Sequence, residues 1–446
     1  MNFGLIGNPL GHSMSKVIHE KLFALKNNEH EYALYPTENV GETFENILKN
    51  LGGFNITIPY KTDIIGLIDK IDGKAAVYNS CNTVKKTENG FLGYNTDVDG
   101  FFKAIEINGI NLENSKILVT GCGGVSRMLT YESVMKNADV SIFARNKEKS
   151  EALKKEIFEK TGKEIKLISA DDIDNNFDII LQGTPVGMYP NGLATPIELK
   201  KICKIPHCFD TIYNPVETMI SKVINYMGGN GVNGLYMLVG QAAKAQEIWL
   251  DCDFSEEEIK ETVAEVHKML NPFKLSKNIV LIGGPGSGKT TLSKELAEFF
   301  DAPLTDTDSE IVKNEGCSIN EIFANHGEEY FRKCETAALK NALSGSGKII
   351  ATGGGIVEKE INRELLKNSD SVVVYIDVDK DIILKRLKND TTRPLLKNGA
   401  SALEELLNRR RSLYESSAHA VVKICDNADK KENTIRIIDE FLKAIN

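Results

Sequence analysis

The sequence predicts an α/β protein whose sheets are mainly parallel. Short β-branched runs alternate with polar or amphipathic stretches along the whole chain, an alternation typical of βαβ units. The runs are GLIGN, GFNITIP, KILVTG, DVSIFAR, FDIILQG, HCFDTIY, NIVLIGG, KIIATGG and SVVVYID. Two of them lead into glycine-rich loops followed by helical patterns, which indicates nucleotide sites at the ends of strands.

The length and charge of the chain restrict its class. A chain of 446 residues predicts two to four domains with full cores, at about 100 to 200 residues per domain. The hydrophobic fraction of 41% and the charged fraction of 26% are typical of a soluble globular protein. A net charge of -9 without a long basic run argues against nucleic-acid binding.

The chain start and the cysteines predict a cytoplasmic protein. The start, MNFGLIGNPLGHS, lacks the basic segment and apolar core of a signal peptide, and no apolar run approaches the ~18 residues of a membrane span. Eight cysteines without paired CxxC spacing indicate reduced thiols. Cys203, His207 and Cys208 lie close together in KICKIPHCFDTIY, but a core strand is favoured there over a metal site because no fourth ligand is near.

The clearest domain boundary falls at residues 267–276. An amphipathic helix rich in Glu and Lys is expected to end at Asn271 and Pro272, before a new strand begins. A softer break follows NTDVDG near residue 100. The chain is therefore expected to hold at least two independent parts.

A phosphate-binding loop is predicted after the strand NIVLIG. The loop fits GxxxxGK[ST] and is followed by the helical pattern TLSKELAEFF, the context that this motif requires. Backbone amides and the helix N-terminus would hold the phosphates of ATP, Lys289 would neutralise them, and the Thr290 hydroxyl would bind Mg²⁺. The predicted ATP-binding residues are Gly283, Gly286, Ser287, Gly288, Lys289, Thr290 and Thr291.

The residues after this loop identify a family. They are Asp306 and Asp308 in PLTDTDSEI, Arg332 in GEEYFRKCE, Gly353, Gly354 and Gly355 after IIAT, Arg393 in TTRPLL, and Arg410 in RRRSLYESSA. In this order the motifs resemble shikimate kinase over residues 277–446, which implies a P-loop fold with a parallel sheet flanked by helices.

The resemblance implies a small carboxylated polyol as acceptor. Arg332 and Arg410 would clamp its carboxylate, which suits planar guanidinium groups. Asp308 would orient or deprotonate the attacking hydroxyl, and Asp306 would help Thr290 to hold Mg²⁺. The glycines at 353–355 would approach the substrate closely, and Arg393 would act from a mobile lid.

A second loop, after the strand KILVT, is typical of dinucleotide binding. Gly121, Gly123 and Gly124 form a GxGG pattern that alone leaves a tight turn possible. The next strand ends in Ala144, Arg145 and Asn146 and lacks the acid that NAD-specific sites place there. Because a cationic side chain suits a 2′-phosphate, the predicted cofactor is NADP(H), with Arg145 at its phosphate.

The first hundred residues carry another constellation. It comprises GNPLGHSMS, GFNITIPYK, YNSCNTV and GYNTDVDG, and it continues through GTPVGM, DTIYNP and NGLYMLVGQAA. These motifs resemble shikimate dehydrogenase over residues 1 to about 266. That family implies a substrate domain at 1–100 plus 232–266, a Rossmann NADP domain at 101–231, the linker at 267–276, and then the kinase domain at 277–446.

The resemblance also implies residue roles in the reductase. Lys61 and Asp97 are the expected proton-transfer pair, with a plain salt bridge as the alternative. Hydroxyls and amides would bind the polyol ring: Ser13, Ser15, Asn55, Thr57, Asn82, Tyr213 and Gln241. The expected NADP contacts are Gly121, Gly123, Gly124, Val125, Arg145, Asn146, Thr184, Met188 and Gly234.

Several positions depart from these family patterns. In the reductase they are Lys16, Ser80, Cys81, Cys122 and Gln182, and in the kinase Gly284, Pro285 and Ser412. None is an expected proton donor or acceptor, although Cys122 lies inside the dinucleotide loop and puts thiol sensitivity and cofactor affinity in question.

Together the resemblances imply a bifunctional enzyme of the shikimate pathway of aromatic amino acid biosynthesis. NADPH would reduce 3-dehydroshikimate to shikimate, and ATP would then phosphorylate shikimate. One alternative is a quinate dehydrogenase joined to a kinase for another hydroxy acid. The other is that one half binds nucleotide without turnover and serves as a regulatory module.

Overall fold

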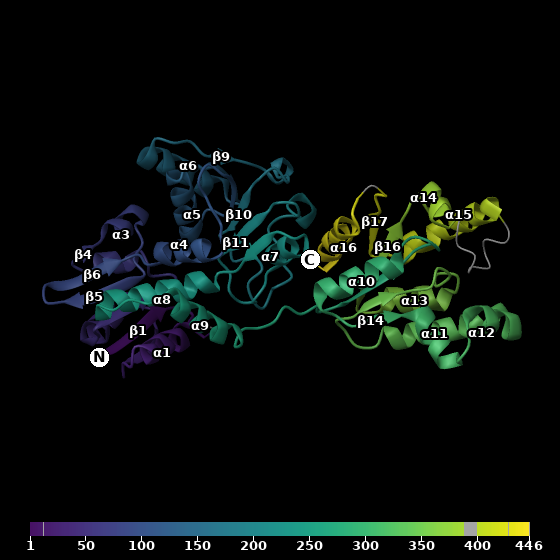
Figure 1. The fold of residues 1–446 in the computed structure, drawn as a ribbon, viewed down its shortest axis with the longest axis horizontal. Helices are drawn as coiled ribbons and strands as arrows, with labels where there is room; N and C mark the ends of the chain where they lie inside the picture. The colour runs from purple at the N-terminus through teal and green to yellow at the C-terminus, as the bar shows by residue number, and fades with distance from the viewer. Residues whose placement is uncertain (12, 388–398, 427, 446) are drawn as a thin grey trace. The chain divides into compact units, whose positions relative to one another are not determined.

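The computed structural model describes residues 1–446 except 12, 388–398, 427 and 446 (Figure 1). The chain forms two compact units. One comprises Met1–Ile197 with Lys204–Pro272, and the other comprises Phe273–Asn446 with Glu198–Cys203.

The first sheet of the first unit has six strands in the order β2-β1-β3-β5-β6-β4. Its strands are β1 (Asn2–Gly7), β2 (Glu31–Pro36), β3 (Gly53–Ile56), β4 (Lys70–Ile71), β5 (Thr83–Thr87) and β6 (Gly90–Tyr94). The neighbouring helices are α1 (Ser15–Leu25), α2 (Val40–Asn46), α3 (Gly73–Tyr78), α4 (Asp97–Ile107), α8 (Leu235–Leu250) and α9 (Glu256–His267).

The β1 strand is buried from its second residue onward and pairs in parallel with β2 and β3, as an apolar run between two partners should. By contrast, β5 and β6 form an antiparallel hairpin that the sequence reading missed. Glu88 and Asn89 form its turn, and Gly90, the first residue of β6, has a φ of 110°.

Helix α9 begins at a capping box in which Ser255 and Glu258 bond each other's backbone amides. The sequence extends this helix to Asn271, but it ends at His267. Turn-type hydrogen bonds from the Met269 and Leu270 amides follow.

The second sheet of the first unit also has six strands, and every pairing in it is parallel. Its order is β12-β11-β10-β7-β8-β9, with β7 (Lys116–Thr120), β8 (Asp139–Phe143), β9 (Lys166–Leu167), β10 (Ile179–Gln182), β11 (His207–Asp210) and β12 (Asn230–Val232). Helices α5 (Gly124–Met135), α6 (Lys147–Thr161) and α7 (Met219–Tyr226) pack against it or one another (Figure 1).

The second unit contains one parallel sheet in the order β14-β15-β13-β16-β17. Its strands are β13 (Asn278–Ile282), β14 (Leu304–Asp306), β15 (Ile349–Ala351), β16 (Ser371–Asp377) and β17 (Ala420–Lys423). Its helices are α10 (Lys289–Phe300), α11 (Thr307–Glu315), α12 (Ile319–Ala342), α13 (Glu360–Asn368), α14 (Lys380–Leu387), α15 (Gly399–Ser417) and α16 (Lys430–Ile445).

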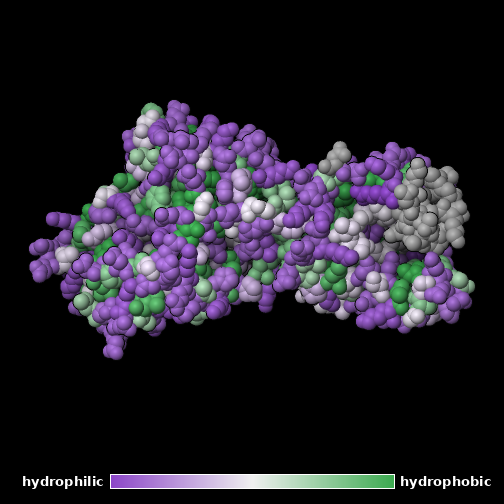
Figure 2. Space-filling view, viewed as in Figure 1, coloured by the Kyte–Doolittle hydropathy of each residue, from purple (hydrophilic) through white to green (hydrophobic). Residues whose placement is uncertain are grey.

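The central strands β13 and β16 are buried along their whole length, as expected for a sheet covered on both faces. Hydrophilic residues cover most of the visible surface of each unit (Figure 2). Within the described ranges, none of the helices has the length and apolar character that crossing a bilayer requires.

Candidate functional site

The predicted proton-transfer pair is formed in the first unit. Lys61 Nζ lies 2.6 Å from Asp97 Oδ2, although the two residues come from a loop and from the start of α4. The Lys61 and Asp97 side chains are 24% and 16% exposed, so both remain accessible from solvent while mostly enclosed. An ammonium group is therefore held against a carboxylate at a partly exposed position, which is compatible with proton transfer.

Two predicted amide side chains surround this pair. Asn82 Nδ2 donates to Asp97 Oδ1 at 2.9 Å and lies 3.4 Å from Gln241 Oε1, while the Thr96 amide donates to Asn82 Oδ1 at 2.8 Å. Asn82 is thus fixed from both ends. The fold brings Lys61, Asp97, Asn82 and Gln241 into one polar cluster.

Asn55 lies beneath this cluster. It is 4% exposed, and its Nδ2 donates to the Asn82 carbonyl and to the Thr83 hydroxyl, at 3.2 and 2.9 Å. Its Oδ1 accepts from the Tyr32 hydroxyl at 2.7 Å. Both polar atoms of Asn55 are therefore engaged with Asn82, Thr83 and Tyr32, and its contact with a substrate stays a prediction.

The remaining predicted ring-binding residues lie on neighbouring loops. Ser13 Oγ accepts from the Ser15 amide at 3.3 Å at the start of α1. Thr57 follows β3 and lies against the end of β1, where a Cβ at Gly7 would come within 2.4 Å of Thr57 Cγ2. Tyr213 packs on the cluster of apolar residues that also holds α1 and α8.

Helices α4 and α8 approach very closely, and this contact sets the positions of Asp97 and Gln241. A Cβ at Gly100 would lie 2.4 Å from the Met237 carbonyl oxygen and 2.8 Å from the Gln241 amide nitrogen. Gly240 faces Gly100 from the other helix, since a Cβ at Gly240 would lie 3.2 Å from the Gly100 Cα. Glycine is required here for close packing rather than for backbone freedom.

The second sheet carries a cavity of about 780 Å³ at the carboxyl ends of β7 and β8. Of the predicted cofactor residues it is lined by Gly121, Gly123, Gly124, Arg145, Asn146 and Thr184. Gly121 has a φ of 88°, a conformation that favours glycine, and α5 begins directly after Gly123. A Cβ at Gly123 or Gly124 would meet open space, so the loop leaves room for a ligand. This cavity fits a dinucleotide.

The cavity is lined by several cationic side chains. Arg145 lines it together with Lys149 and Arg127, which the sequence reading did not select. Lys149 donates its amide to the Asn146 side chain, the N-cap of α6, which turns the first residues of this helix toward the cavity. Lys149 carries no motif of its own, so its place at the cavity follows from the fold.

Three predicted cofactor contacts do not line this cavity. Val125 packs against the apolar core of the second sheet, and Met188 is 49% exposed. Gly234 packs tightly, since a Cβ there would come within 2.2 Å of the Thr211 carbonyl oxygen.

Gln182, one of the family departures, is fully buried at the end of β10. Its Oε1 accepts from the Thr184 amide and hydroxyl at 3.1 and 3.0 Å, and its Nε2 donates to the Val186 carbonyl at 3.1 Å. This side chain therefore organises the loop that presents Thr184 to the cavity.

The phosphate-binding loop of the second unit has the predicted strand-to-helix form. Lys289 starts α10, and its Nζ donates to the Gly283 and Gly284 carbonyls at 2.8 and 2.9 Å. Gly288 adopts a φ of 89° as the N-cap of that helix. The departure Gly284 has a steric cause, because a Cβ there would lie 2.6 Å from Leu407 Cδ2.

A cavity of about 250 Å³ borders this loop and was not predicted. It is lined by Gly286, Ser287, Gly288, Thr291, Leu292, Arg386, Ile424, Cys425, Asp426, Ala428, Lys430 and Asn433. Arg386 Nη2 donates to Asp426 Oδ1 at 3.1 Å. Arg386 has no sequence motif, so only the fold reveals it.

The residues expected to hold Mg²⁺ lie near strand ends. Thr290 is exposed in the first turn of α10, and Asp306 ends β14. Asp306 Oδ1 accepts from the Asp308 and Ser309 amides at 3.0 and 3.2 Å and so caps α11. A hydroxyl and a carboxylate suit Mg²⁺.

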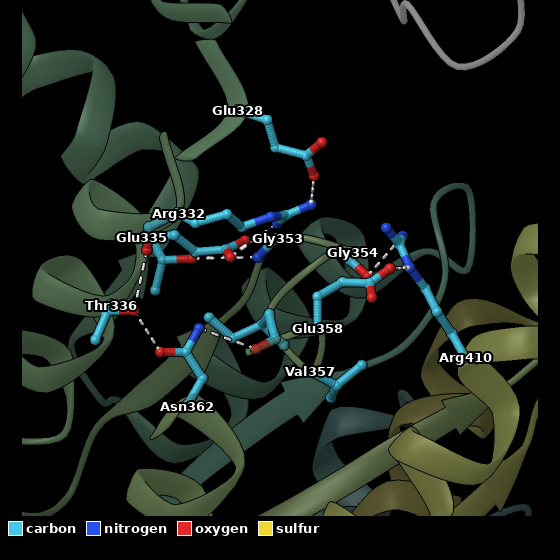
Figure 3. A network of polar contacts seen from close by, with 12 residues as sticks. Glu328, Arg332, Glu335, Thr336, Gly353, Gly354, Val357, Glu358, Asn362 and Arg410 are labelled. Atoms are coloured by element: carbon cyan, nitrogen blue, oxygen red, sulfur yellow. Dashed lines mark hydrogen bonds and ion pairs between the residues drawn. The ribbon is translucent and has the colours of Figure 1, made fainter. Parts of the chain in front are cut away.

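Arg332 is held by carboxylates on its own helix (Figure 3). Its Nη1 donates to Glu335 Oε2 at 2.8 Å and its Nη2 to Glu328 Oε1 at 3.1 Å. Burial raises the pKa of the Glu335 carboxyl, against the lowering effect of Arg332. The Arg332 guanidinium is thus buried and held between two carboxylates.

Gly353 and Gly355 leave room for these groups. A Cβ at Gly353 would lie 2.5 Å from Asp308 Oδ1, and one at Gly355 would lie 2.1 Å from Arg332 Nη1. Asp308 and Arg332 therefore both lie close to the glycine loop.

Arg410 reaches the same loop from α15 (Figure 3). Its Nη1 donates to the Gly354 carbonyl at 3.2 Å, and its Nε donates to Glu358 Oε1 at 2.5 Å. The Tyr414 hydroxyl also donates to the Gly354 carbonyl, at 2.5 Å. Arg393, the predicted lid arginine, lies outside the described residues.

The comparisons with known proteins match both halves of the chain. Residues 285–446 match the family model described as shikimate kinase, and residues 5–84 match the model of the shikimate dehydrogenase substrate binding domain.

The first half is similar to entire proteins. The shikimate dehydrogenase (NADP(+)) of Methanococcus maripaludis is 40% identical over 254 residues, which cover 55% of this chain and 90% of that protein. A shikimate dehydrogenase solved in complex with NADP+ is 32% identical, with a TM-score of 0.55 over 59% of this chain and 95% of that chain. A chorismate mutase/shikimate 5-dehydrogenase fusion protein from Clostridium acetobutylicum is 34% identical, with a TM-score of 0.55 over 60% and 97%.

Proposed function

The chain belongs to the shikimate dehydrogenase family and carries a shikimate kinase domain, and from this premise we propose that it catalyses two consecutive reactions. In the first, NADPH reduces 3-dehydroshikimate to shikimate. In the second, ATP phosphorylates shikimate to 3-phosphoshikimate. The observation that carries the proposal is that one chain holds the Lys61–Asp97 pair and a dinucleotide-sized cavity in one unit, and two buried arginines and a phosphate loop in the other.

In the reductase, this chain's residues position the ketone and manage its proton. NADPH supplies the hydride when it is bound. Lys61 delivers a proton to the carbonyl oxygen as the carbon is reduced, and Asp97 holds the ammonium in place at 2.6 Å. Asn82 fixes the other Asp97 oxygen, so the carboxylate cannot turn away from Lys61.

The ring of the substrate is proposed to bind between the loops that carry Ser13, Ser15 and Thr57 and the side chains of Tyr213 and Gln241. Neutral donors and acceptors suit hydroxyl groups because they give direction without excess charge. We assign Asn55 to supporting Asn82, since its polar atoms are engaged there.

The cofactor contacts are assigned from the cavity. Arg145 and Lys149 would take the 2′-phosphate of NADP, and the glycine loop at 121–124 would take the pyrophosphate at the start of α5. For Val125, Met188 and Gly234, an indirect role through the shape of the site is proposed.

In the kinase, the acceptor is held by charge and the donor by backbone. Arg332 and Arg410 bind the carboxylate of shikimate, and Asp308 accepts the proton of the attacking hydroxyl. The loop at 283–291 and Lys289 hold the ATP phosphates, Thr290 and Asp306 would hold Mg²⁺, and Arg393 is proposed to reach the phosphates from its own segment.

The proposed domain limits follow the three sheets. The substrate domain spans 1–100 plus 232–266, the NADP domain 101–231 and the kinase domain 277–446, with 267–276 as linker. Because all eight cysteines are free thiols, we place the protein in the cytoplasm.

Two single variants of the whole chain test the proposal. Lys61→Ala should lower only NADP⁺-linked oxidation of shikimate, by about 10²- to 10⁴-fold, the usual contribution of a general acid. Lys289→Ala should lower only ATP-dependent phosphorylation, by about 10²- to 10³-fold. Each variant serves as the control for the other.

The alternatives make different forecasts for these assays. A quinate enzyme would show a larger kcat/KM for quinate than for shikimate in the reductase assay. A regulatory half would leave the pure wild-type protein without one of the two activities, and that result would sink the bifunctional proposal.

A further inference from the structure

Glu358 is a carboxylate of the acceptor site that no sequence motif identified. It follows the glycine loop by three residues, and its amide donates to the Gly355 carbonyl at 2.9 Å (Figure 3). Its Oε1 accepts from Arg410 Nε at 2.5 Å and from Arg409 Nη2 at 2.7 Å. One carboxylate thus pairs with two consecutive arginines of α15.

The two arginines differ in burial, and this decides which of them depends on Glu358. The Arg410 side chain is 5% exposed, whereas that of Arg409 is 66% exposed. A buried guanidinium that loses its partner is left with an uncompensated charge, but an exposed one is solvated by water. Glu358 therefore matters chiefly to Arg410.

Glu358 is a charged partner at neutral pH. Burial acts to raise the pKa of this carboxyl, but Arg410 and Arg409 outweigh that effect and hold the pKa below its ordinary value. The ion pair with Arg410 is charge-assisted and directs the Nε edge of the guanidinium.

The backbone that carries Glu358 is itself fixed. Arg363 Nη1 donates to the Val357 and Glu358 carbonyls at 2.8 and 3.1 Å, and the buried Asn362 donates from Nδ2 to the Ile356 carbonyl at 3.0 Å. The carboxylate therefore cannot drift with a loose loop.

The same arrangement holds the other substrate arginine, since Arg332 pairs with the buried Glu335 at 2.8 Å. We propose that Glu358 is a positioning residue of the acceptor site, which holds Arg410 in the orientation that receives the carboxylate of shikimate. The proposal rests on the kinase function proposed above. It makes Glu358 a determinant of acceptor affinity that acts through Arg410.

The test is Glu358→Gln in the full chain, which keeps the size of the side chain and removes its charge. We expect the KM for shikimate in the kinase assay to rise by about tenfold or more, the size of effect that loss of a charge-assisted hydrogen bond produces. The kcat and the KM for ATP should change by less than about threefold, because Glu358 contacts neither the phosphate loop nor Asp308 in the described residues.

Two controls lie within the same chain. Glu360→Gln removes an exposed carboxylate two residues away and should leave the kinase KM for shikimate unchanged. The reductase KM for shikimate reports the same compound at a different site and should not respond to Glu358→Gln. Thermal melting shows whether the variant remains folded.

Glu358→Asp keeps the charge on a shorter side chain and should recover part of the lost affinity. An unchanged or lowered KM in Glu358→Gln would overturn the proposal, because Glu358 would then be indifferent to the acceptor or compete with it. If Glu358→Gln does not fold, the Glu358→Asp variant decides. A folded Glu358→Asp protein with the wild-type KM for shikimate supports the need for a charge at this position. A folded Glu358→Asp protein without affinity for shikimate contradicts the proposal. A wild-type chain without kinase activity on shikimate would instead refute the underlying function.

Discussion

Single residues of this protein do their work through partners that are distant in sequence. Lys61 meets Asp97, Arg410 meets Glu358, and Asn82 lies 3.4 Å from Gln241. Each pair is formed by the fold, so each contact depends on the positions of the two backbone segments that carry the partners.

Gly355 shows how narrow the acceptor site is. In Gly355→Ala the new Cβ would lie 2.1 Å from Arg332 Nη1, so the guanidinium must move from its place against Glu335. We expect a rise of about tenfold or more in the kinase KM for shikimate, since about 1.4 kcal/mol of lost binding is tenfold. Steady-state kinetics measure this effect, and reductase activity should stay at its wild-type value; an unchanged KM would mean that Arg332 is not a substrate ligand.

Asp210 predicts a pH dependence of stability in the first unit. Burial raises the pKa of its carboxyl from an ordinary 3.8 to about 7, although hydrogen bonds from the Thr218 hydroxyl and the Ile212 amide act to lower it. Because the folded state holds this proton more tightly than the unfolded chain, the stabilising contribution of neutral Asp210 is complete below about pH 4. It is lost as the pH rises through about 7.

Asp210→Asn should remove this dependence, because the amide does not titrate in this range. The Tm of the variant minus the Tm of the wild type should therefore increase between pH 5 and pH 8, by about 2–4 °C for each kcal/mol lost by the wild type. Melting curves at several pH values measure the difference. A constant difference across that range would show that Asp210 is not protonated in the folded protein.

At the scale of the elements, the contact between α4 and α8 positions two residues of the predicted reductase site, Asp97 and Gln241. Gly100 and Gly240 let these helices touch, and α4 begins at Asp97 while α8 holds Gln241. Gly100→Ala would place a Cβ 2.4 Å from the Met237 carbonyl oxygen, which cannot move without its helix.

We expect Gly100→Ala to destabilise the first unit by about 1–3 kcal/mol, the usual cost of overpacking. It should also lower reductase kcat/KM for shikimate, because Asp97 and Gln241 are pushed apart. Chemical denaturation and kinetics measure the two effects. Gly73→Ala on α3 is the control, because its Cβ would meet open space, and it should change neither the stability nor the reductase kcat/KM. Gly109→Ala is unsuitable as a control because Gly109 has a φ of 67°.

The sequence predicted the elements that carry local signals. Both glycine loops lie between a strand and a helix, as predicted. They were predictable because an apolar run, the glycines and the following Lys or Val all occur within one short stretch of sequence. The hairpin of β5 and β6 was not predicted, although Asn89 lies in its turn and Gly90 directly follows, a pair that is a turn signal. The structure also ends α9 earlier than its amphipathic pattern suggests.

The residues that sequence reasoning missed share a physical reason. Arg386, Lys149 and Glu358 are ordinary charges in helices or loops, and a solvated surface charge looks the same in sequence. Their places follow from strand order and from how the helices pack. Asn55 is a motif residue whose buried side chain bonds the Asn82 carbonyl, a contact that the motif does not predict.

At the scale of the whole molecule, the chain joins two compact units with separate nucleotide sites. Ligands that bind only the folded state stabilise the unit that holds their site, by about 2.7 kcal/mol at 100 times Kd.

Scanning calorimetry should therefore show two unfolding transitions. NADP⁺ should raise the midpoint temperature of one, and ADP with Mg²⁺ should raise the midpoint temperature of the other. Lys289→Ala should weaken the response to ADP with Mg²⁺ and leave the NADP⁺ response intact. If NADP⁺ and ADP shifted one and the same transition equally, the two units would unfold as one, and the division proposed for the chain would be wrong.

Gly354 has a consequence for inhibitor chemistry. The Gly354 carbonyl accepts hydrogen bonds from Arg410 and Tyr414. A Cβ at Gly354 would lie 3.2 Å from the backbone nitrogen of Pro285 in the phosphate loop. A single residue, Gly354, therefore lies between the phosphate loop and Arg410, the arginine proposed to bind the carboxylate. A compound that tethers a cyclic carboxylic acid to a nucleotide tail needs only a short linker to occupy both places at once.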